Sequence, residues 1–342
     1  MDDSKNFIYS LPQKMLMATV INRPSKINKS PYLADIVIDS TGEISIAHSP
    51  SLGCGGLITS GVKVYVLPCE SKTKDKNVLR DLKSPETQRV SKYILYHIQN
   101  IEKINTGPVP FEIIHNPICA HPNMANTIVG KMLEKKMIAG LENLTHIKAE
   151  ATIEPLVKIE NFNEDCILEN EKTCRFDFSG MFEAELLNVL IEVKCVPLAD
   201  YVDVLPKHRA KTLDSIKPEN RKLNAIFPYG TSRKYELVSP RALKHIKNLE
   251  AYSSLEAKLP ENPENSLEAQ TSENPENSLK SYKTFMIYIT MRDDVEAIKI
   301  SELDVEYRKA VFTAKEHGVN LLGYSIRWEN EKAYLNKVLP VI

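Results

Sequence analysis

Residues 174–182 read CRFDFSGMF, and residues 187–195 read LNVLIEVKC. Both segments are short and rich in aromatic or branched apolar residues, which is typical of buried strands. Each segment also contains charged residues, namely Asp177 in the first and Glu192 and Lys194 in the second. The two segments therefore predict consecutive strands that carry charged groups into an otherwise apolar sheet.

The spacing of the charged residues in the second segment determines which way they point. Side chains alternate along a strand, so Glu192 and Lys194 share one face, whereas Ile191, Val193 and Cys195 share the other. A carboxylate and an ammonium group between apolar neighbours are costly to bury without partners. A metal ion and a phosphate would supply such partners.

Hydrolysis of a phosphodiester requires a hard cation held by oxygen ligands, a nucleophilic water and positive charge near the transition state. We expect Asp177 and Glu192 to hold Mg²⁺ or Mn²⁺, the carbonyl of Val193 to add a ligand, and Lys194 to orient the water. The side chains of Asp177, Glu192 and Lys194 are therefore the predicted catalytic groups of a metal-dependent nuclease. The alternative is an exposed strand-edge salt bridge, Glu192 with Lys194 or Asp177 with Arg175, which would contribute little to stability.

The surrounding segments predict an α/β sandwich. Helical spacing of apolar residues begins behind a candidate Asn123 cap and continues for four to five turns. A later helix is expected to begin at a Ser301 cap and to end at Gly318. The remaining expected elements are a strand over 146–157, a helix over 239–255, and strands over 282–290 and 319–328.

The N-terminal part has a different pattern, in which short apolar runs alternate with turn residues. This pattern predicts a small β-barrel or sandwich over residues 14–105. Such a barrel could bind a ligand, or it could have no binding role, because a fold alone does not define a function. The expected strands cover residues 15–23, 32–39, 43–49, 62–68 and 91–103.

Composition narrows the class of protein. The chain has 342 residues, which is long enough to form two hydrophobic cores. Hydrophobic residues make up 42% of it and charged residues 26%, and these ordinary values exclude a chain that is disordered throughout. The six cysteines contain no Cys-x-x-Cys pair, so reduced thiols are expected rather than a zinc ribbon. The acidic N-terminal segment lacks the apolar core of a signal peptide, and no run of about 18 apolar residues occurs. We expect a soluble, cytoplasmic protein without a membrane partner.

A polar repeat interrupts the C-terminal part. The heptapeptide ENPENSL occurs at Glu261 and again at Glu273. Such a composition cannot bury a core, so residues 254–281 are expected to form a disordered insertion.

Basic residues concentrate close to the carboxylate–lysine segment. Between Leu205 and Leu249 there are eleven Lys and Arg residues against three acidic ones, a net charge of +8, although the whole chain has a net charge of -1. This excess indicates a surface for nucleic acid phosphates, DNA in the first place, unless it is only a solvated face. His245 follows Arg241 by one helical turn and adjoins Lys244, so it is expected to contact phosphate or move a proton, unless it is merely packed.

The order of several motifs resembles the sugar fermentation stimulation protein A family. The matching stretches are ATVINR, SPYLADIV, ISIAHSP, CRFDFSGMF, LIEVKCVPLAD, PRALKHIKNLE, LDVEYRKAVFTAKEHGVNLLGYSI and LPVI. They run in order from about Met17 to Ile342, with insertions near 201–239 and 254–281.

The resemblance implies an OB-like barrel over residues 14–105 and a restriction-endonuclease-like α/β sandwich of the PD-(D/E)xK type over residues 106–342. It also implies non-specific DNA binding and a role in sugar metabolism. The family's site positions fall on Asp177, Glu192 and Lys194, and those of its basic helix on Arg241, Lys244 and His245. Arg175 and His48 complete the expected nucleic-acid contacts.

Two positions depart from the family pattern. Lys131 stands where the family has a helix glutamate, and residues 48–53 read HSPSLG in place of a His-x-Pro-Asn-Thr-Gly loop. A lysine facing the two carboxylates would repel a cation, and Glu150 is the candidate replacement ligand. The expected activity is therefore metal-dependent hydrolysis, and the alternative is a non-catalytic DNA-binding regulator with a degenerate metal site.

Overall fold

A computed structural model describes residues 3–49, 57–69, 91–104, 111–153, 174–229, 239–254 and 281–342, without the side chains of 101–104, 111–113, 206–207 and 209–210. The predicted disordered insertion, the Gly-rich loop after His48 and the expected boundary at residue 105 lie at least partly outside this range. Among the described residues, no helix is long and apolar enough to cross a membrane. Cys69, Cys119, Cys174 and Cys195 form no disulfide.

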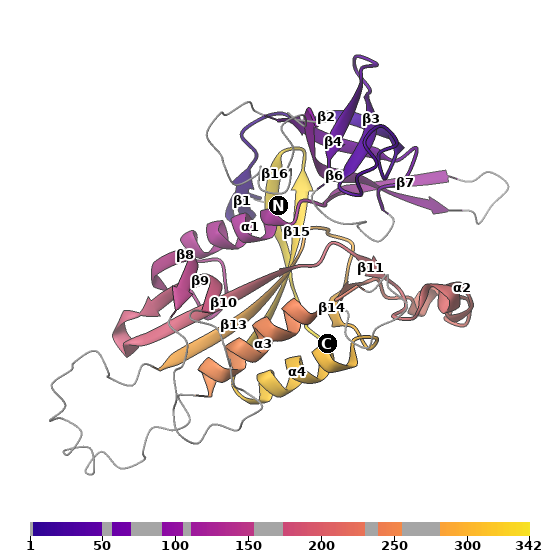
Figure 1. Cartoon of the computed structure of the whole chain (residues 1–342). Coiled ribbons are helices and arrows are strands. Elements are labelled where there is room, and N and C mark those ends of the chain that lie inside the picture. Colours follow the sequence, from indigo (N-terminus) through magenta and orange to yellow (C-terminus); the bar gives the residue numbers. More distant parts are fainter. Residues whose placement is uncertain are drawn as a thin grey trace, which may run out of the picture.

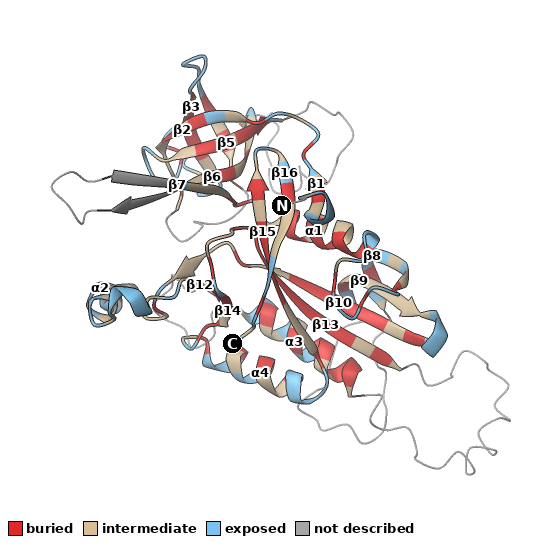
Figure 2. Ribbon diagram, turned by 180° about the vertical axis from the view of Figure 1, so that it is seen from behind, coloured by how far each residue is buried: buried red, intermediate tan, exposed pale blue. Residues whose placement is uncertain are grey.

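A seven-stranded mixed sheet forms the larger part of the molecule, in the order β1-β16-β15-β13-β10-β9-β8 (Figure 1). The strands β10, β13 and β15 are parallel to their neighbours in this group, and none of their residues is exposed (Figure 2). Such continuous burial explains their runs of branched apolar residues. The strands are β1 (Phe7–Ser10), β8 (Thr145–Ile153), β9 (Cys174–Phe182), β10 (Leu187–Cys195), β13 (Tyr282–Thr290), β15 (Asn320–Glu329) and β16 (Lys332–Leu339).

Helices cover both faces of this sheet (Figure 1). One face packs against α1 (Asn123–Glu134) through residues such as Ile128 and Ile191, and the other against α3 (Pro240–Ser253) and α4 (Val305–Glu316). A small sheet, β11-β12-β14, extends the second face, and α2 (Pro206–Asp214) lies beside it. The small strands are β11 (Ala199–Asp200), β12 (Asn224–Phe227) and β14 (Ala297–Ile300).

The N-terminal strands form a barrel, as the sequence predicts. The sheet order is β4-β3-β2-β5-β6-β7, and a β4–β6 pairing closes the five strands β2 to β6. The sheet continues past residue 105 into β7, whereas β1 precedes the barrel in sequence and pairs with β16 of the larger sheet. The strands are β2 (Leu16–Asn22), β3 (Leu33–Ile38), β4 (Ile44–His48), β5 (Lys63–Pro68), β6 (Tyr93–Ile104) and β7 (Phe111–Cys119).

Three helix boundaries differ from the sequence expectations. The first helix ends at Glu134, because Lys136 adopts a positive φ of 57° that a helix cannot continue through. Its N-cap is Pro122, with no side-chain hydrogen bond, rather than Asn123. The cap of α4 is Asp304, whose carboxylate accepts the Tyr307 N–H, rather than Ser301.

Aromatic and imidazole rings join the barrel to the larger sheet. His97 of β6 packs on Trp328 of β15 with ring centroids 4.5 Å apart, and His121 stacks on Tyr96 at 4.6 Å. His97 is fully buried, and neither of its ring nitrogens has a hydrogen-bond partner among the described residues. Burial lowers the pKa of His97 to about 3, with His121 as a smaller cause, and burial also lowers the pKa of His121 to about 4. Both rings are therefore neutral in the folded protein near neutral pH.

Replacing His97 should weaken the acid sensitivity of this junction. Below pH 6.5 an unfolded histidine binds a proton, whereas buried His97 does not until about pH 3, so folding stability falls as pH drops through this window. The change His97→Phe keeps a ring against Trp328 and removes the titrating group. We expect urea denaturation to show the variant at least as stable at pH 7.5 and less destabilised at pH 4. Equal losses in both proteins would contradict the prediction.

Candidate functional site

The site lies where two strands of the large sheet part. β9 and β10 pair from Phe182↔Leu187 to Phe178↔Ile191, and beyond this point β9 pairs only with β8. Backbone N–H groups need partners wherever a ladder ends. At this fork the carboxylate of Asp177 takes over the role of the missing strand and accepts the Val193 N–H at 2.8 Å through Oδ2.

A second amide holds the other oxygen of Asp177. Asn126 of α1 donates its side-chain N–H to Asp177 Oδ1 at 2.8 Å. Burial raises the pKa of Asp177, and the nearby Glu192 charge adds to this effect, while the Val193 and Asn126 bonds and the Lys194 charge oppose it. The carboxyl group is thus held in place, but its negative charge is poorly compensated.

Glu192 lies close to Asp177 and has different partners. Its Oε2 accepts a hydrogen bond from Lys194 Nζ at 3.0 Å and contacts His245 Nδ1 at 2.5 Å, and Lys194 lies 3.1 Å from the same ring nitrogen. Only 2% of the Glu192 side chain is exposed. Burial alone would raise the pKa of Glu192, but the His245 hydrogen bond and the charges of Lys194 and His245 outweigh it and lower the pKa. Glu192 and Lys194 thus lie on the same face of β10, as the alternation of side chains predicts.

Helix α3 brings its predicted residues to the same place. His245 reaches Glu192 from the helix, and Arg241 Nε lies 3.4 Å from His245 Nε2. Arg241 and Lys244 are exposed on this helix, next to the buried cluster. Glu192, Lys194 and His245 therefore come together as predicted, and Arg241 lies beside them.

Four residues singled out from the sequence lie away from the fork's centre. Arg175 is 63% exposed and pairs with Glu150 at 2.6 Å, so Glu150, the suggested replacement ligand, is occupied by this ion pair. His48 lies at the end of β4, where the barrel closes, and burial lowers its pKa. Lys131 donates to Glu134 at 2.7 Å and is partly exposed. The expectation that Lys131 faces the carboxylates is not met, since the α1 side chain that contacts Asp177 is Asn126.

Sequence reasoning missed Asn126 and the residues behind Glu192. Tyr307 of α4 is buried near Glu192, whose charge contributes to a raised Tyr307 pKa, although burial is the main cause. The Tyr307 and Tyr288 hydroxyls are 2.8 Å apart. A polar residue on the inner stripe of α1 was the one available signal for Asn126.

The donor set of the fork fits a divalent cation only together with further ligands. Among the described residues, no three His, Cys, Asp or Glu side chains converge as a cation site. Asp177 and Glu192 nevertheless offer two carboxylates of the type that Mg²⁺, Mn²⁺ and Ca²⁺ prefer, and Mg²⁺ usually keeps several waters. The poorly compensated charge of Asp177 suits a cation, so the residues present fit one if backbone, water or phosphate oxygens complete the coordination.

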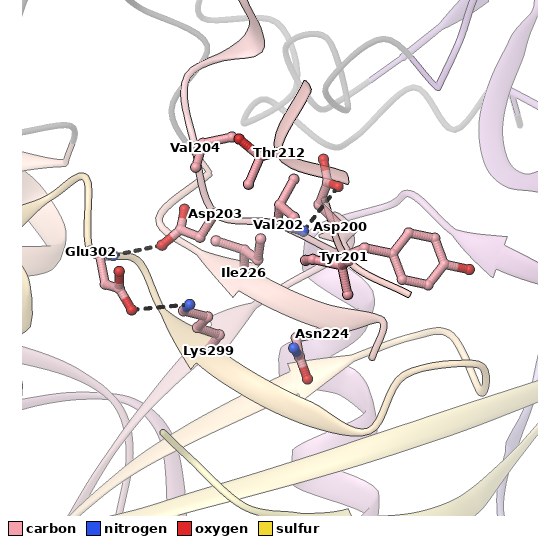
Figure 3. A pocket seen from close by; sticks show the side chains of 11 residues that line it. Asp200, Tyr201, Val202, Asp203, Val204, Thr212, Asn224, Ile226, Lys299 and Glu302 are labelled. Carbon is pink, nitrogen blue, oxygen red and sulfur yellow. Dashed lines mark hydrogen bonds and ion pairs between the residues drawn. The ribbon is translucent and has the colours of Figure 1, made fainter. Parts of the chain in front are cut away.

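A separate pocket of about 230 Å³ lies between β12, β14 and the segment before α2 (Figure 3). Its charged groups are largely held by neighbours. Asp203 accepts hydrogen bonds from Ser301 at 3.1 Å and from the Glu302 N–H at 2.6 Å, and Lys299 pairs with Glu302 at 3.0 Å. This pocket does not include the carboxylates of the fork.

The fold and the cluster together define a class: a mixed α/β protein with an N-terminal five-stranded barrel and a buried carboxylate–lysine–histidine cluster at a strand fork. No family model matches the chain. A sugar fermentation stimulation protein homolog from Alteromonas mediterranea is 25% identical over 330 residues, which cover 96% of this chain and 97% of the relative. A solved structure of Pyrococcus furiosus SfsA in complex with Ca²⁺ has a TM-score of 0.59 at 13% identity and covers 98% of this chain and 99% of its own. The resemblance to the sugar fermentation stimulation protein family is thus confirmed over nearly the whole chain.

Removing the Glu192 charge should destabilise the fold. The variant Glu192→Gln removes the carboxylate to which Lys194 donates, while only 12% of the Lys194 side chain is exposed to water. Breaking a buried ion pair in this way costs about 3 kcal/mol. Because the pKa of Glu192 is lowered on folding, its contribution is present above about pH 4.5 and is lost as pH falls further.

The matched control for this prediction is Glu150→Gln, which removes the same charge from the exposed pair with Arg175. Chemical denaturation at pH 7 should show a loss of under about 1 kcal/mol for this control. Equal losses in the two variants would show that the buried cluster does not depend on the Glu192 charge.

Proposed function

We propose that the protein binds nucleic acid and that its larger part is a restriction-endonuclease-like domain of the PD-(D/E)xK type, preceded by an OB-like barrel. The observation that carries this proposal is the convergence of Asp177, Glu192 and Lys194 at the fork of β9 and β10. The exposed Arg241 and Lys244 on the neighbouring helix supply positive charge for phosphate.

The proposed activity is metal-dependent hydrolysis of a phosphodiester, with Mg²⁺ or Mn²⁺ as the cofactor. Asp177 and Glu192 would hold the cation together with the carbonyl of Val193, and a bound cation would supply Lewis acidity. Lys194 would orient the water, and His245, in contact with both Glu192 and Lys194, is placed to exchange a proton with either group. The Ca²⁺ complex of the Pyrococcus protein supports a divalent cation.

A second candidate function is a non-catalytic DNA-binding regulator. The observation in its favour is that α1 presents the amide of Asn126 to the fork rather than a carboxylate. With two carboxylates only, a cation would bind weakly and turnover could be lost while the charged surface is kept. The two candidates share the binding surface and differ in hydrolysis.

Hydrolysis is tested with labelled single- and double-stranded DNA and RNA. The full chain is incubated with Mg²⁺, with Mn²⁺ or with EDTA, next to the variant Asp177→Ala. The nuclease proposal predicts cleavage that needs the cation and disappears in the variant. Binding without cleavage under every condition would select the regulator, and cleavage that survives Asp177→Ala would reject the proposed site.

Binding is tested separately through its salt dependence. Replacing Arg241 and Lys244 together by alanine removes two phosphate contacts, so the log–log slope of affinity against salt should become shallower by about 2. The control replaces Lys309 and Lys315 on α4, two exposed lysines outside the site, and should leave the slope unchanged. A double variant that binds DNA with the wild-type slope would argue against this surface.

A further inference from the structure

Asn126 is a polar residue on a helix stripe that is otherwise built for packing. Its neighbours Ala125, Ile128 and Val129 are fully buried in the core beneath α1. An amide at the edge of such a stripe is costly unless it is hydrogen-bonded. The partner it has is the Asp177 carboxylate, at 2.8 Å.

The helix lies directly on the strand that carries Asp177. At Gly130, one turn after Asn126, an added Cβ would meet the ring of Phe178 at 3.4 Å, which is ordinary van der Waals contact. Phe178 is the residue after Asp177 and the last of β9 to pair with β10. Because this packing fixes α1 against the fork, Asn126 cannot drift away from the carboxylate without disturbing the core.

The two carboxylates of the fork are held in different ways. Glu192 has two potentially cationic partners, Lys194 and His245, on one oxygen. Asp177 has one neutral N–H donor on each oxygen, from Asn126 and from the Val193 backbone. A carboxylate offers about four acceptor directions, so these two bonds fix the plane of the group and leave room for a cation on the same oxygens.

We propose that Asn126 is a positioning residue that holds the Asp177 carboxylate in the orientation required to bind a divalent cation. This inference rests on the proposed function, which places the cation at Asp177 and Glu192. Hydrogen bonds that orient a ligating carboxylate typically change metal affinity by about 10- to 100-fold. The sequence pointed to Lys131 as the residue of α1 that faces the carboxylates and repels a cation, whereas the residue of α1 that contacts Asp177 is Asn126, whose amide is neutral.

The test measures Ca²⁺ and Mn²⁺ affinity of the full chain by isothermal titration calorimetry. The variant Asn126→Leu keeps the size of the side chain and removes the amide, and it should weaken cation binding about 10- to 100-fold. The variant Asn126→Gln keeps an amide and should bind more tightly than the leucine variant. Thr127→Val is the matched control, because the Thr127 hydroxyl donates to the helix backbone at Asn123 rather than to the fork, and it should bind as the wild type does.

Thermal unfolding without metal checks that the variants fold, since leucine at this position should not lower the midpoint. Wild-type affinity in Asn126→Leu, together with lost binding in Asp177→Ala, would overturn the role of Asn126 and leave the proposed cation site intact. Undiminished binding in Asp177→Ala, or a wild-type chain that binds neither ion, would overturn the cation site and this inference with it.

Discussion

The hydrogen bond from the Val193 N–H to the Asp177 carboxylate makes the fork in the sheet tolerable. Two antiparallel strands can part only if the backbone groups they abandon find other partners, because an unsatisfied buried N–H costs free energy. Here a side chain from one departing strand provides the bond that its backbone no longer provides. The same step brings a carboxylate beside Glu192, so the chemistry of the site and the geometry of the sheet have one cause.

The helices behind the site are held in place by a buried acid. Asp304 is fully buried, caps α4 by accepting the Tyr307 N–H, and also accepts the Ser239 N–H at 3.3 Å at the start of α3. Because α3 carries His245 and α4 carries Tyr307, the two helices that surround Glu192 share this one residue. The contacts of Asp304 therefore help to set the position of α3 relative to Glu192, although Asp304 is not one of the two carboxylates of the fork.

The sequence predicted the elements that have a strong local pattern. The barrel strands, β9, β10, β13 and α3 follow from alternation, continuous apolar runs or helical spacing. β16 and the short strands β12 and β14 were missed, because they are too short or too polar for such a signal and form by pairing with distant partners. In the site, the alternation of side chains along a strand correctly predicted that Glu192 and Lys194 lie on the same face. It could not identify Asn126, because that contact depends on where α1 docks, nor show that Lys131 turns toward Glu134.

The pairing of β1 with β16 joins the beginning of the described chain to its end. The polypeptide enters the large sheet at Phe7–Ser10, leaves it to build the barrel, and returns to complete the sheet with Lys332–Leu339. During synthesis on the ribosome, β1 emerges before the barrel strands, and its partner β16 emerges after them. The barrel strands are therefore complete before β16 is made, and β1 can take its place at the edge of the large sheet only after β16 has been synthesised. The barrel is thus an insertion between β1 and the other strands of the large sheet. Because it is connected to this sheet at both ends, its movement relative to the sheet is restricted.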